Sequence, residues 1–372
     1  MKKLIYATSY TDNSLVIFDV SNPYDIKNIG SAVGDWATKA TPYHCGNMVK
    51  LSNGVVMVDN HDVGGVYNLL TSIKVSDRQN PSVMDSIGSA IMPLKTIEMS
   101  KDRVGNFLIG TSYSWAVTGG TTCVLSIDCS SPDNLILADY FDGNELVYGR
   151  FKSVATFHLE DYIYVQTWNN DYLRVFDIDK DNGSLTLLYS ILFKHPINGN
   201  DHIQQAIVDN DNTVYAICRD TVYVFKIIDG AIKFMSYLDL EDIDGNSAIC
   251  YRLVKHGNYV YLSDYNCHAV RVIDASNVRN ISQIGYLTGS GSPNYLGNAY
   301  DISAYGDYAY VSCEGDNSLT ILDISDPTNI SYVNNISGAG SPNYLTWTDN
   351  SVIHRRLSGG VGVCTRTRQA VR

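Results

Sequence analysis

The sequence predicts an all-β fold, a seven-bladed β-propeller made of four-stranded antiparallel blades. The first supporting observation is a phrase that returns roughly every 49 residues, a period typical of propeller blades. Each copy is a hydrophobic strand that ends on Asp and leads into a Ser, Asp or Asn turn, often with Pro. Clear copies lie at residues 15–23 (LVIFDVSNP), 124–132 (VLSIDCSSP), 173–179 (LRVFDID), 270–276 (VRVIDAS) and 319–327 (LTILDISDP).

The second observation is that two weaker copies complete the series. They lie at residues 71–81 and 222–230, where lysine replaces the aspartate. The seven anchor residues are Asp19, Lys74, Asp128, Asp177, Lys226, Asp274 and Asp323. Successive anchors are 55, 54, 49, 49, 48 and 49 residues apart, which fits seven repeats. The anchor aspartates are expected to cap the following turn by accepting backbone N–H groups, rather than to form a ring of calcium ligands.

The third observation is the two-residue periodicity inside each repeat. In the last repeat, short segments rich in Tyr, Val and Ile lie at residues 299–303, 308–313, 318–324 and 330–337, separated by Gly, Asp, Asn and Pro. These are the features of strands and turns. Helical repeats require apolar residues at positions i, i+3, i+4 and i+7, and the sequence has no such run.

The first repeat predicts how the ring closes. Residues 4–10 align with the second strand of a blade, so the innermost strand of the first blade must come from elsewhere. The phrase at residues 338–353 repeats the one at 289–302, which leads into an innermost strand. We therefore expect a C-terminal strand near residues 348–354 to complete the first blade and close the ring. The predicted domains are a propeller over 1–354 and a short basic tail over 355–372.

The phrases at residues 15–23 and 319–327, together with YVYLSDYNCHAVRVIDAS at 259–276, resemble the LVIVD-repeat proteins, a propeller family. The resemblance implies a binding or scaffold role, and many family members are exported to the cell surface. It supplies no catalytic motif that could be transferred to residues of this chain. Fold alone does not determine function.

Charge and hydropathy exclude several classes of partner. The chain has a net charge of −12, which disfavours binding of duplex nucleic acid. Five arginines and no acidic residue follow position 354, so the remainder carries −17. No apolar run is long enough to span a membrane, and no signal peptide is predicted at the start. We expect cytoplasmic synthesis, followed by incorporation into a virus particle or export by a non-classical route. The eight dispersed cysteines predict free thiols.

Ligand-binding candidates lie where the innermost strands should begin, because loops from all blades converge at the channel mouth. The corresponding segments are 42–47, 148–152, 200–204, 245–252 and 296–301. Their candidate ligand-binding residues are His44, Arg150, His202 and Arg252. The side chains of the two arginines are suited to binding an anionic ligand. No catalytic residue, metal site or cofactor is predicted, because three or four ligands in a fixed geometry cannot be identified.

Candidate interaction surfaces lie where the repeat is interrupted. Insertions at residues 58–72 and 111–123 carry His61, Tyr113 and Trp115, and aromatic side chains often dominate interface energetics. The two GSPNYL phrases add Tyr295 and Tyr344.

Three functional hypotheses follow. The first is a non-enzymatic interaction or scaffold module that binds a protein partner or self-assembles, including a structural or host-recognition role in a virion. The second is a channel-mouth enzyme, either a lyase or an oxidoreductase, or a metal-binding propeller. The third is a lectin-like propeller that binds a surface glycan.

Overall fold

The computed structural model describes most of the repeat region. The described residues are 3–9, 14–33, 45–51, 54–60, 68–88, 97–113, 122–142, 153–159, 162–167, 172–192, 203–209, 211–228, 231–338, 343, 345 and 348–355. They form strands and turns without a helix, as predicted. Within these ranges, no helix could cross a membrane.

The described strands form seven four-stranded antiparallel sheets. In spatial order, the first sheet contains β28 (Thr348–Arg355), β1 (Lys3–Ser9), β2 (Ser14–Asp19) and β3 (Lys27–Val33). The second contains β4 (Cys45–Leu51), β5 (Val55–Asn60), β6 (Asn68–Lys74) and β7 (Ser82–Gly88). The third contains β8 (Ile97–Val104), β9 (Phe107–Tyr113), β10 (Thr122–Asp128) and β11 (Ile136–Asp142). The fourth contains β12 (Ser153–Leu159), β13 (Tyr162–Thr167), β14 (Tyr172–Ile178) and β15 (Leu185–Leu192).

The remaining sheets repeat this order. The fifth contains β16 (Gln205–Val208), β17 (Thr213–Cys218), β18 (Thr221–Ile228) and β19 (Ala231–Asp239). The sixth contains β20 (Cys250–His256), β21 (Tyr259–Asp264), β22 (Ala269–Asp274) and β23 (Ser282–Thr288). The seventh contains β24 (Ala299–Tyr305), β25 (Tyr308–Cys313), β26 (Ser318–Asp323) and β27 (Ser331–Ser337).

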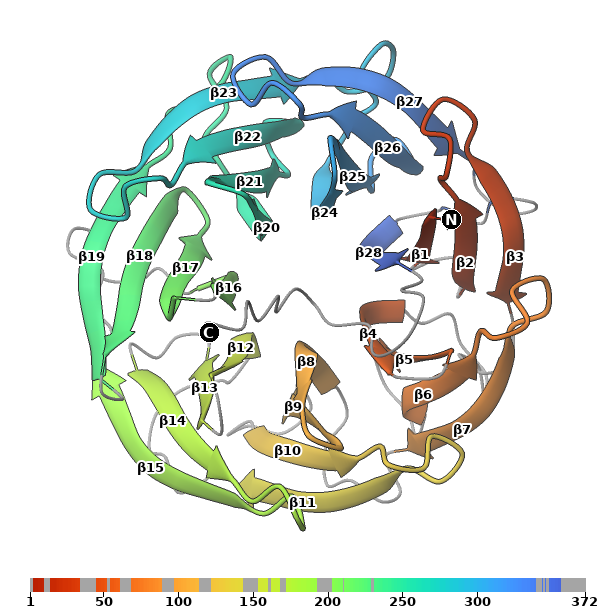
Figure 1. Ribbon diagram of the computed structural model, residues 1–372, viewed down its shortest axis with the longest axis vertical. Coiled ribbons are helices and arrows are strands. Elements are labelled where there is room, and N and C mark those ends of the chain that lie inside the picture. The colour runs from red at the N-terminus through yellow and green to blue at the C-terminus, as the bar shows by residue number, and fades with distance from the viewer. Residues whose placement is uncertain are drawn as a thin grey trace, which may run out of the picture.

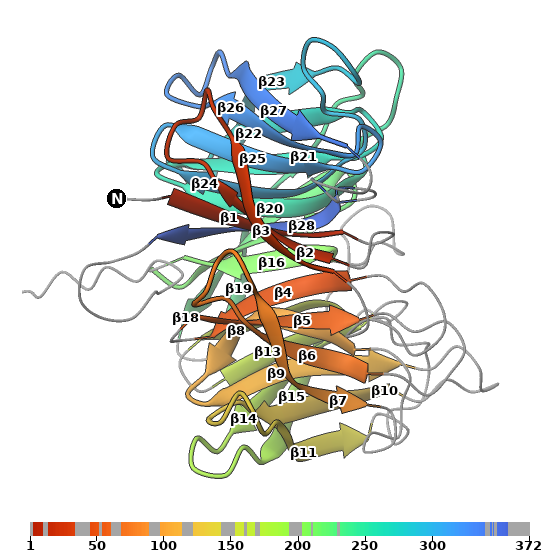
Figure 2. The ribbon, with the colours of Figure 1, turned by 90° about the vertical axis from the view of Figure 1, so that its right-hand side faces the viewer.

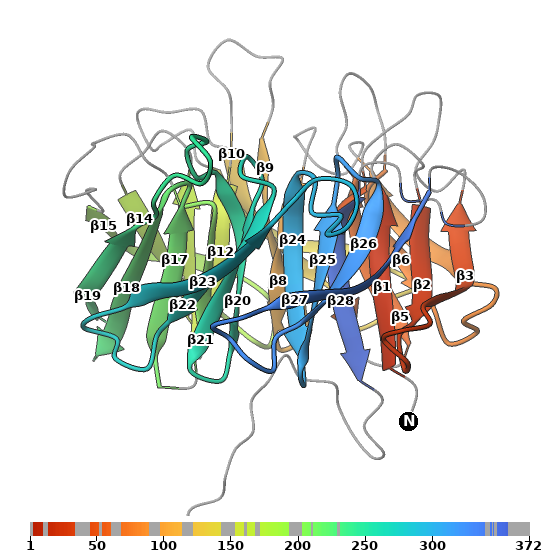
Figure 3. The same cartoon turned by 90° about the horizontal axis from the view of Figure 1, so that it is seen from above.

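The sheets are arranged around a common centre, with the first strand of each sheet innermost and the fourth outermost (Figure 1). Seen from the side, the strands run across a thick disc (Figure 2). The antiparallel registers of the sixth sheet place Cys250, Asp264, Ala269 and Thr288 in one row. The start of the innermost strand and the turn between the second and third strands therefore lie at the same end of the disc, opposite the N-terminus (Figure 3). We call this the mouth end.

The core lies between neighbouring sheets. In β21 and β22, nearly every residue is buried. Leu262 and Ile273 pack towards the fifth sheet against Val224, whereas Tyr261 and Val272 pack towards the seventh. Because both faces of the middle strands are covered, these strands are almost continuously apolar instead of alternating with polar residues.

The anchor aspartates of four sheets cap turns as predicted, namely Asp19, Asp128, Asp274 and Asp323. In the fourth sheet, a cap of this kind is made by Asp179. The Asp19 carboxylate accepts the backbone N–H of Ser21 at 3.0 Å, and Asp274 accepts that of Ser276 at 2.8 Å. The bond from Ser276 holds the pKa of Asp274 below its usual value. These aspartates therefore have a structural role, that of fixing the turn before the outermost strand of their own sheet.

The C-terminal strand β28 pairs antiparallel with β1, from Lys3 opposite Arg355 to Ser9 opposite Thr348. The strand ends one residue later than the sequence indicates. Of the basic tail predicted over residues 355–372, Arg355 belongs to β28, and residues 356–372 lie outside the described residues. Among the described cysteines, Cys250, Cys267 and Cys313 are buried free thiols, in agreement with the sequence analysis.

Neighbouring sheets approach so closely at Gly30 in β3 that a side chain there would collide with the carbonyl oxygen of Arg78. We expect Gly30→Ala to lower the free energy of unfolding by about 1–3 kcal/mol through overpacking, measured by urea denaturation. Gly285 has the same position in the sixth sheet, but its added Cβ would lie 3.0 Å from the Pro327 carbonyl oxygen. Gly285→Ala should therefore lower the free energy of unfolding by a smaller amount than Gly30→Ala. Equal midpoints for the Gly30 variant and the parent would contradict this close approach.

Candidate functional site

The structure describes two of the predicted site residues well enough to place their side chains. Arg252 lies in β20 at the mouth end, where a ligand-binding role was expected. Tyr295 lies in the β23–β24 connection, and its ring packs against Tyr332 with centroids 6.1 Å apart. Tyr113 ends β9, and its side chain is outside the description. The other candidates, His44, His61, Trp115, Arg150, His202 and Tyr344, lie outside the described residues, so these assignments remain predictions.

Two tyrosines reach the mouth end through matching β-bulges. The pairing of β20 with β21 passes from Cys250 to Arg252 and leaves Tyr251 without an opposite residue. The pairing of β24 with β25 skips Tyr300 in the same way. A bulge turns the side chain of its extra residue away from the regular alternation, and bulges often occur beside functional sites.

These bulges bring together an aromatic cluster. The rings of Tyr251 and Tyr300 have centroids 5.2 Å apart, and Tyr265 lies 5.3 Å from the first and 6.4 Å from the second. All three residues are partly exposed. The guanidinium carbon of Arg252 lies 5.4 Å from the centroid of the Tyr300 ring, in cation–π contact. Arg252 also donates through Nη1 to the backbone carbonyl of Tyr251 at 3.1 Å, which fixes its direction.

An acidic residue completes this group. The side chain of Glu314, in the β25–β26 turn, forms a hydrogen bond with the hydroxyl of Tyr265. Partial burial raises the pKa of Glu314 above its ordinary value, although the bond from Tyr265 opposes this. Burial, followed by the nearby Glu314 charge, raises the pKa of Tyr265 to about 12. Tyr265 therefore stays protonated near neutral pH and can donate to the carboxylate. We call Tyr251, Arg252, Tyr265, Tyr300 and Glu314 the mouth cluster.

The connection before β24 supports the mouth cluster. Asn298 forms a side-chain hydrogen bond with Tyr265, and its backbone N–H donates to Nδ1 of His268 at 2.9 Å. The backbone carbonyl of Asn298 accepts the N–H of Glu314 at 3.1 Å. One residue thus contacts both members of the Tyr265–Glu314 pair and links the sixth sheet to the seventh.

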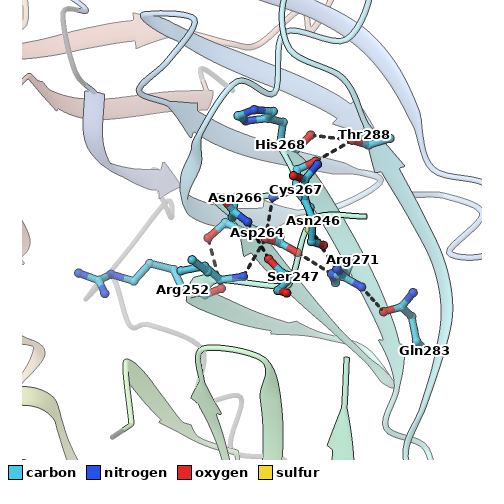
Figure 4. Close-up of polar contacts among 12 residues, drawn as sticks. Asn246, Ser247, Arg252, Asp264, Asn266, Cys267, His268, Arg271, Gln283 and Thr288 are labelled. Carbon is cyan, nitrogen blue, oxygen red and sulfur yellow. Dashed lines mark hydrogen bonds and ion pairs between the residues drawn. The ribbon is translucent and has the colours of Figure 1, made fainter. Parts of the chain in front are cut away.

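A buried ion pair holds the strand ends beneath the cluster. Nε of Arg271 lies 2.7 Å from Asp264, and both side chains are 0% exposed. The same carboxylate accepts the backbone N–H groups of Ile249 and Cys267, both at 3.1 Å. Figure 4 shows this network, with Arg252 pointing away from it. The pair therefore ties the segment that leads to Tyr251 to the turn that carries Tyr265.

Further bonds fasten the same two segments. Nδ2 of Asn266 donates to the carbonyl of Ser247 at 2.9 Å, and the thiol of Cys267 donates to the carbonyl of Asn246 at 3.1 Å (Figure 4). Burial raises the pKa of the Cys267 thiol, and the adjacent Asp264 charge raises it further. This thiol is therefore a structural donor and a poor nucleophile.

Most of the mouth cluster was not predicted from the sequence. Tyr251 and Tyr300 lie within two of the predicted mouth segments, but only the bulges bring their side chains together. One signal was available: Tyr251 and Tyr300 occupy equivalent repeat positions, as do Tyr265 and Glu314. The described residues contain no group of three or more His, Cys, Asp or Glu side chains suited to a metal ion.

The cluster combines a carboxylate, aromatic rings and a positive charge at one place. A partly buried carboxylate with a raised pKa is suited to accept a proton, and its tyrosine partner keeps it oriented. The neighbouring rings offer apolar surface, and the arginine offers a fixed positive charge.

Several solved structures have the same fold at low sequence identity. A periplasmic gluconolactonase from Pseudomonas aeruginosa has a TM-score of 0.74 and 10% identity, over 95% of this chain and 99% of its own. A proposed 6-phosphogluconolactonase from Bacteroides fragilis has a TM-score of 0.71 and 13% identity, over 95% of this chain and 98% of its own. Another from Bacteroides uniformis has a TM-score of 0.69 and 13% identity, over 95% and 99%. At such identities, the likeness establishes a propeller-like fold.

These comparisons correct the functional prediction. The expected non-enzymatic scaffold or virion component is contradicted, because the similar folds belong to proteins named as lactonases. The lyase, oxidoreductase, metal-binding and lectin-like alternatives find no support either. The error came from inferring a function from a repeat family whose pattern carries no chemistry.

Sequence comparison agrees with the predicted repeat. No curated protein matches the chain. The LVIVD repeat family matches residues 9–31, in the first sheet, and residues 296–337, in the seventh. These are two of the regions in which the recurring phrase is clearest. The chain therefore carries LVIVD repeats at these two places and has an all-β, propeller-like fold.

Proposed function

We propose that this protein is a hydrolase that opens a lactone ring at the mouth cluster, with Glu314 as the general base. The observation that carries the proposal is the Tyr265–Glu314 pair, a partly buried carboxylate with a raised pKa and a fixed orientation. A partly buried carboxylate with a raised pKa is a candidate for a catalytic base. The names of the similar structures support lactone hydrolysis within the wider class of hydrolases.

The reaction follows from the position of the carboxylate. Glu314 takes a proton from a water molecule as the water oxygen attacks the lactone carbonyl carbon. The ring C–O bond of the resulting intermediate then breaks, and the proton passes from Glu314 to the departing ring oxygen. The net change adds one water and gives a hydroxy acid. Tyr265 keeps the carboxylate in place throughout, because its raised pKa preserves its O–H group.

Replacing Glu314 with Gln tests the proposal. The substitution keeps the size of the side chain but removes its ability to accept a proton, so we expect kcat for glucono-δ-lactone to fall at least about 100-fold. The rate is measured in a pH-stat and corrected for spontaneous ring opening. In the parent protein, activity should fall as the pH drops through a pKa above 4.5, because only the ionised carboxylate is a base. The activity that remains in the Gln variant should not show this fall at low pH.

A matched control uses another glutamate. Glu241 is exposed in the β19–β20 connection. Glu241→Gln should leave kcat and the pH profile unchanged. Full activity in Glu314→Gln, or no hydrolysis by the parent protein above the spontaneous rate, would refute the proposal.

The proposed site depends on the relative position of two sheets, and we propose that all seven sheets are the blades of one closed propeller spanning residues 1–354. Contacts between the innermost strands of successive sheets support this: β28 contacts β4 and β24, and β20 contacts β16 and β24. The pairing of β28 with β1 also supports it, because it joins the two ends of the chain in one sheet.

A further inference from the structure

The mouth cluster has two chemically different ends. Glu314 is bound to Tyr265, whereas Arg252 lies against Tyr300, and the centroids of these two rings are 6.4 Å apart. Tyr251 packs against both rings. The base and the fixed positive charge are therefore held by two different rings of the same aromatic cluster.

The arginine end is preorganised. The contact with Tyr300 and the bond to the Tyr251 carbonyl restrict the guanidinium before any ligand arrives. Less conformational entropy is then lost on binding. The rigid fork of a guanidinium matches the oxygens of a carboxylate or phosphate, and partial burial strengthens such a contact.

The strand that carries Arg252 is also held in place. The backbone N–H of the next residue, Leu253, donates to Oε1 of Gln205 in the fifth sheet at 2.7 Å. Arg252 itself directly follows the bulge at Tyr251. Its backbone is thus fixed from one side by a neighbouring sheet and from the other by the buried pair below.

We infer that the substrate is an anionic sugar lactone, whose ring packs on Tyr251 and Tyr300 and whose carboxylate or phosphate binds Arg252. The inference rests on the proposed function and specifies its substrate class. With the anionic group at Arg252, the ring spans the aromatic surface and its carbonyl end lies towards Glu314. An uncharged lactone would use the same base but lose the arginine contact.

The first experiment compares three lactones: glucono-δ-lactone, which is uncharged, 6-phosphogluconolactone, which carries a phosphate, and glucarolactone, which carries a carboxylate. We expect Arg252→Gln to lower kcat/KM at least about tenfold for the charged lactone that the parent prefers, mainly through KM. The value for the uncharged lactone should fall by a smaller factor, because that lactone makes no ionic contact with the guanidinium. For the charged lactone, Arg252→Lys should have a kcat/KM between those of the parent and of Arg252→Gln. Lysine keeps the positive charge but lacks the forked guanidinium. Arg279→Gln, an exposed arginine in the β22–β23 connection, is the matched control.

The second experiment measures binding without turnover. Calorimetry with 6-phosphogluconate and with glucarate is performed on Glu314→Gln and on the double variant that also contains Arg252→Gln. Binding of either acid that is lost in the double variant supports the inference. If this binding is seen but the parent hydrolyses none of the lactones, the proposed hydrolysis is wrong and the anion-binding site is supported on its own. Hydrolysis of lactones with equal kcat/KM in the parent and Arg252→Gln, or equal binding by both calorimetry variants, overturns the inference.

Discussion

Arg271→Met is expected to lower the free energy of unfolding by about 3–5 kcal/mol, because it leaves the buried Asp264 carboxylate without its counter-ion. Both side chains are fully buried, and Nη1 of Arg271 also donates to Oε1 of Gln283 at 3.0 Å. Urea denaturation of the purified variant measures the loss. Since Asp264 also holds the segments below the mouth cluster, the proposed hydrolysis should weaken in the part of the population that stays folded.

The repeat provides an unusually close control for this prediction. The equivalent positions in the seventh sheet hold Cys313 and Thr320, whose side chains contact each other at 3.9 Å without any charge. The double variant Asp264→Cys, Arg271→Thr should therefore recover much of the stability lost in Arg271→Met. Removal of a complete buried ion pair is often nearly neutral, whereas removal of one partner is not.

A second control uses a solvent-exposed ion pair. Lys226 and Asp211 lie 3.3 Å apart with side chains 32% and 56% exposed, so Lys226→Met should change stability little. If Lys226→Met and Arg271→Met lower the free energy of unfolding equally, burial of the ion pair does not determine how much stability is lost. A double variant no more stable than Arg271→Met would show that the surrounding sheet cannot accept the uncharged pair.

The fold could be predicted because the same residues perform the same local task in successive sheets. Asp19 and Asp274 both cap the turn before an outermost strand, and their spacing is visible without a structure. The apolar runs around them reflect middle strands covered on both faces. The pairing of β28 with β1 was foreseen for the same reason, since the phrase before β28 repeats the one before β24.

The mouth cluster could be predicted only in part. Arg252 was identified from its place at the start of an innermost strand. Tyr251 and Tyr300 were not predicted, because the contact between them depends on two bulges. A shift of one residue in register cannot be recognised in a strand of mixed Tyr, Arg and Leu. Glu314 escaped because its raised pKa comes from burial between two sheets, which no local pattern reports.

Removal of residues 348–372 is expected to destabilise the protein by more than about 5 kcal/mol, beyond the range of most single substitutions. The deletion takes away β28 and leaves β1 as an open edge whose residues Ile5 and Ala7 are otherwise 0% exposed. It also removes the contacts of β28 with β4 and β24. An open apolar edge is a template for pairing with other chains, so the truncated protein should associate in light scattering and unfold at lower urea.

The control deletes only residues 356–372, which leaves β28 complete. This shorter deletion should keep the parent's unfolding midpoint, whereas the longer one should not. A synthetic peptide of residues 346–355, added to the longer deletion, should restore the midpoint by supplying the missing strand in trans. If the longer deletion unfolds like the parent, the pairing of β28 with β1 contributes nothing to stability, and the proposed closure of the ring at this sheet is wrong.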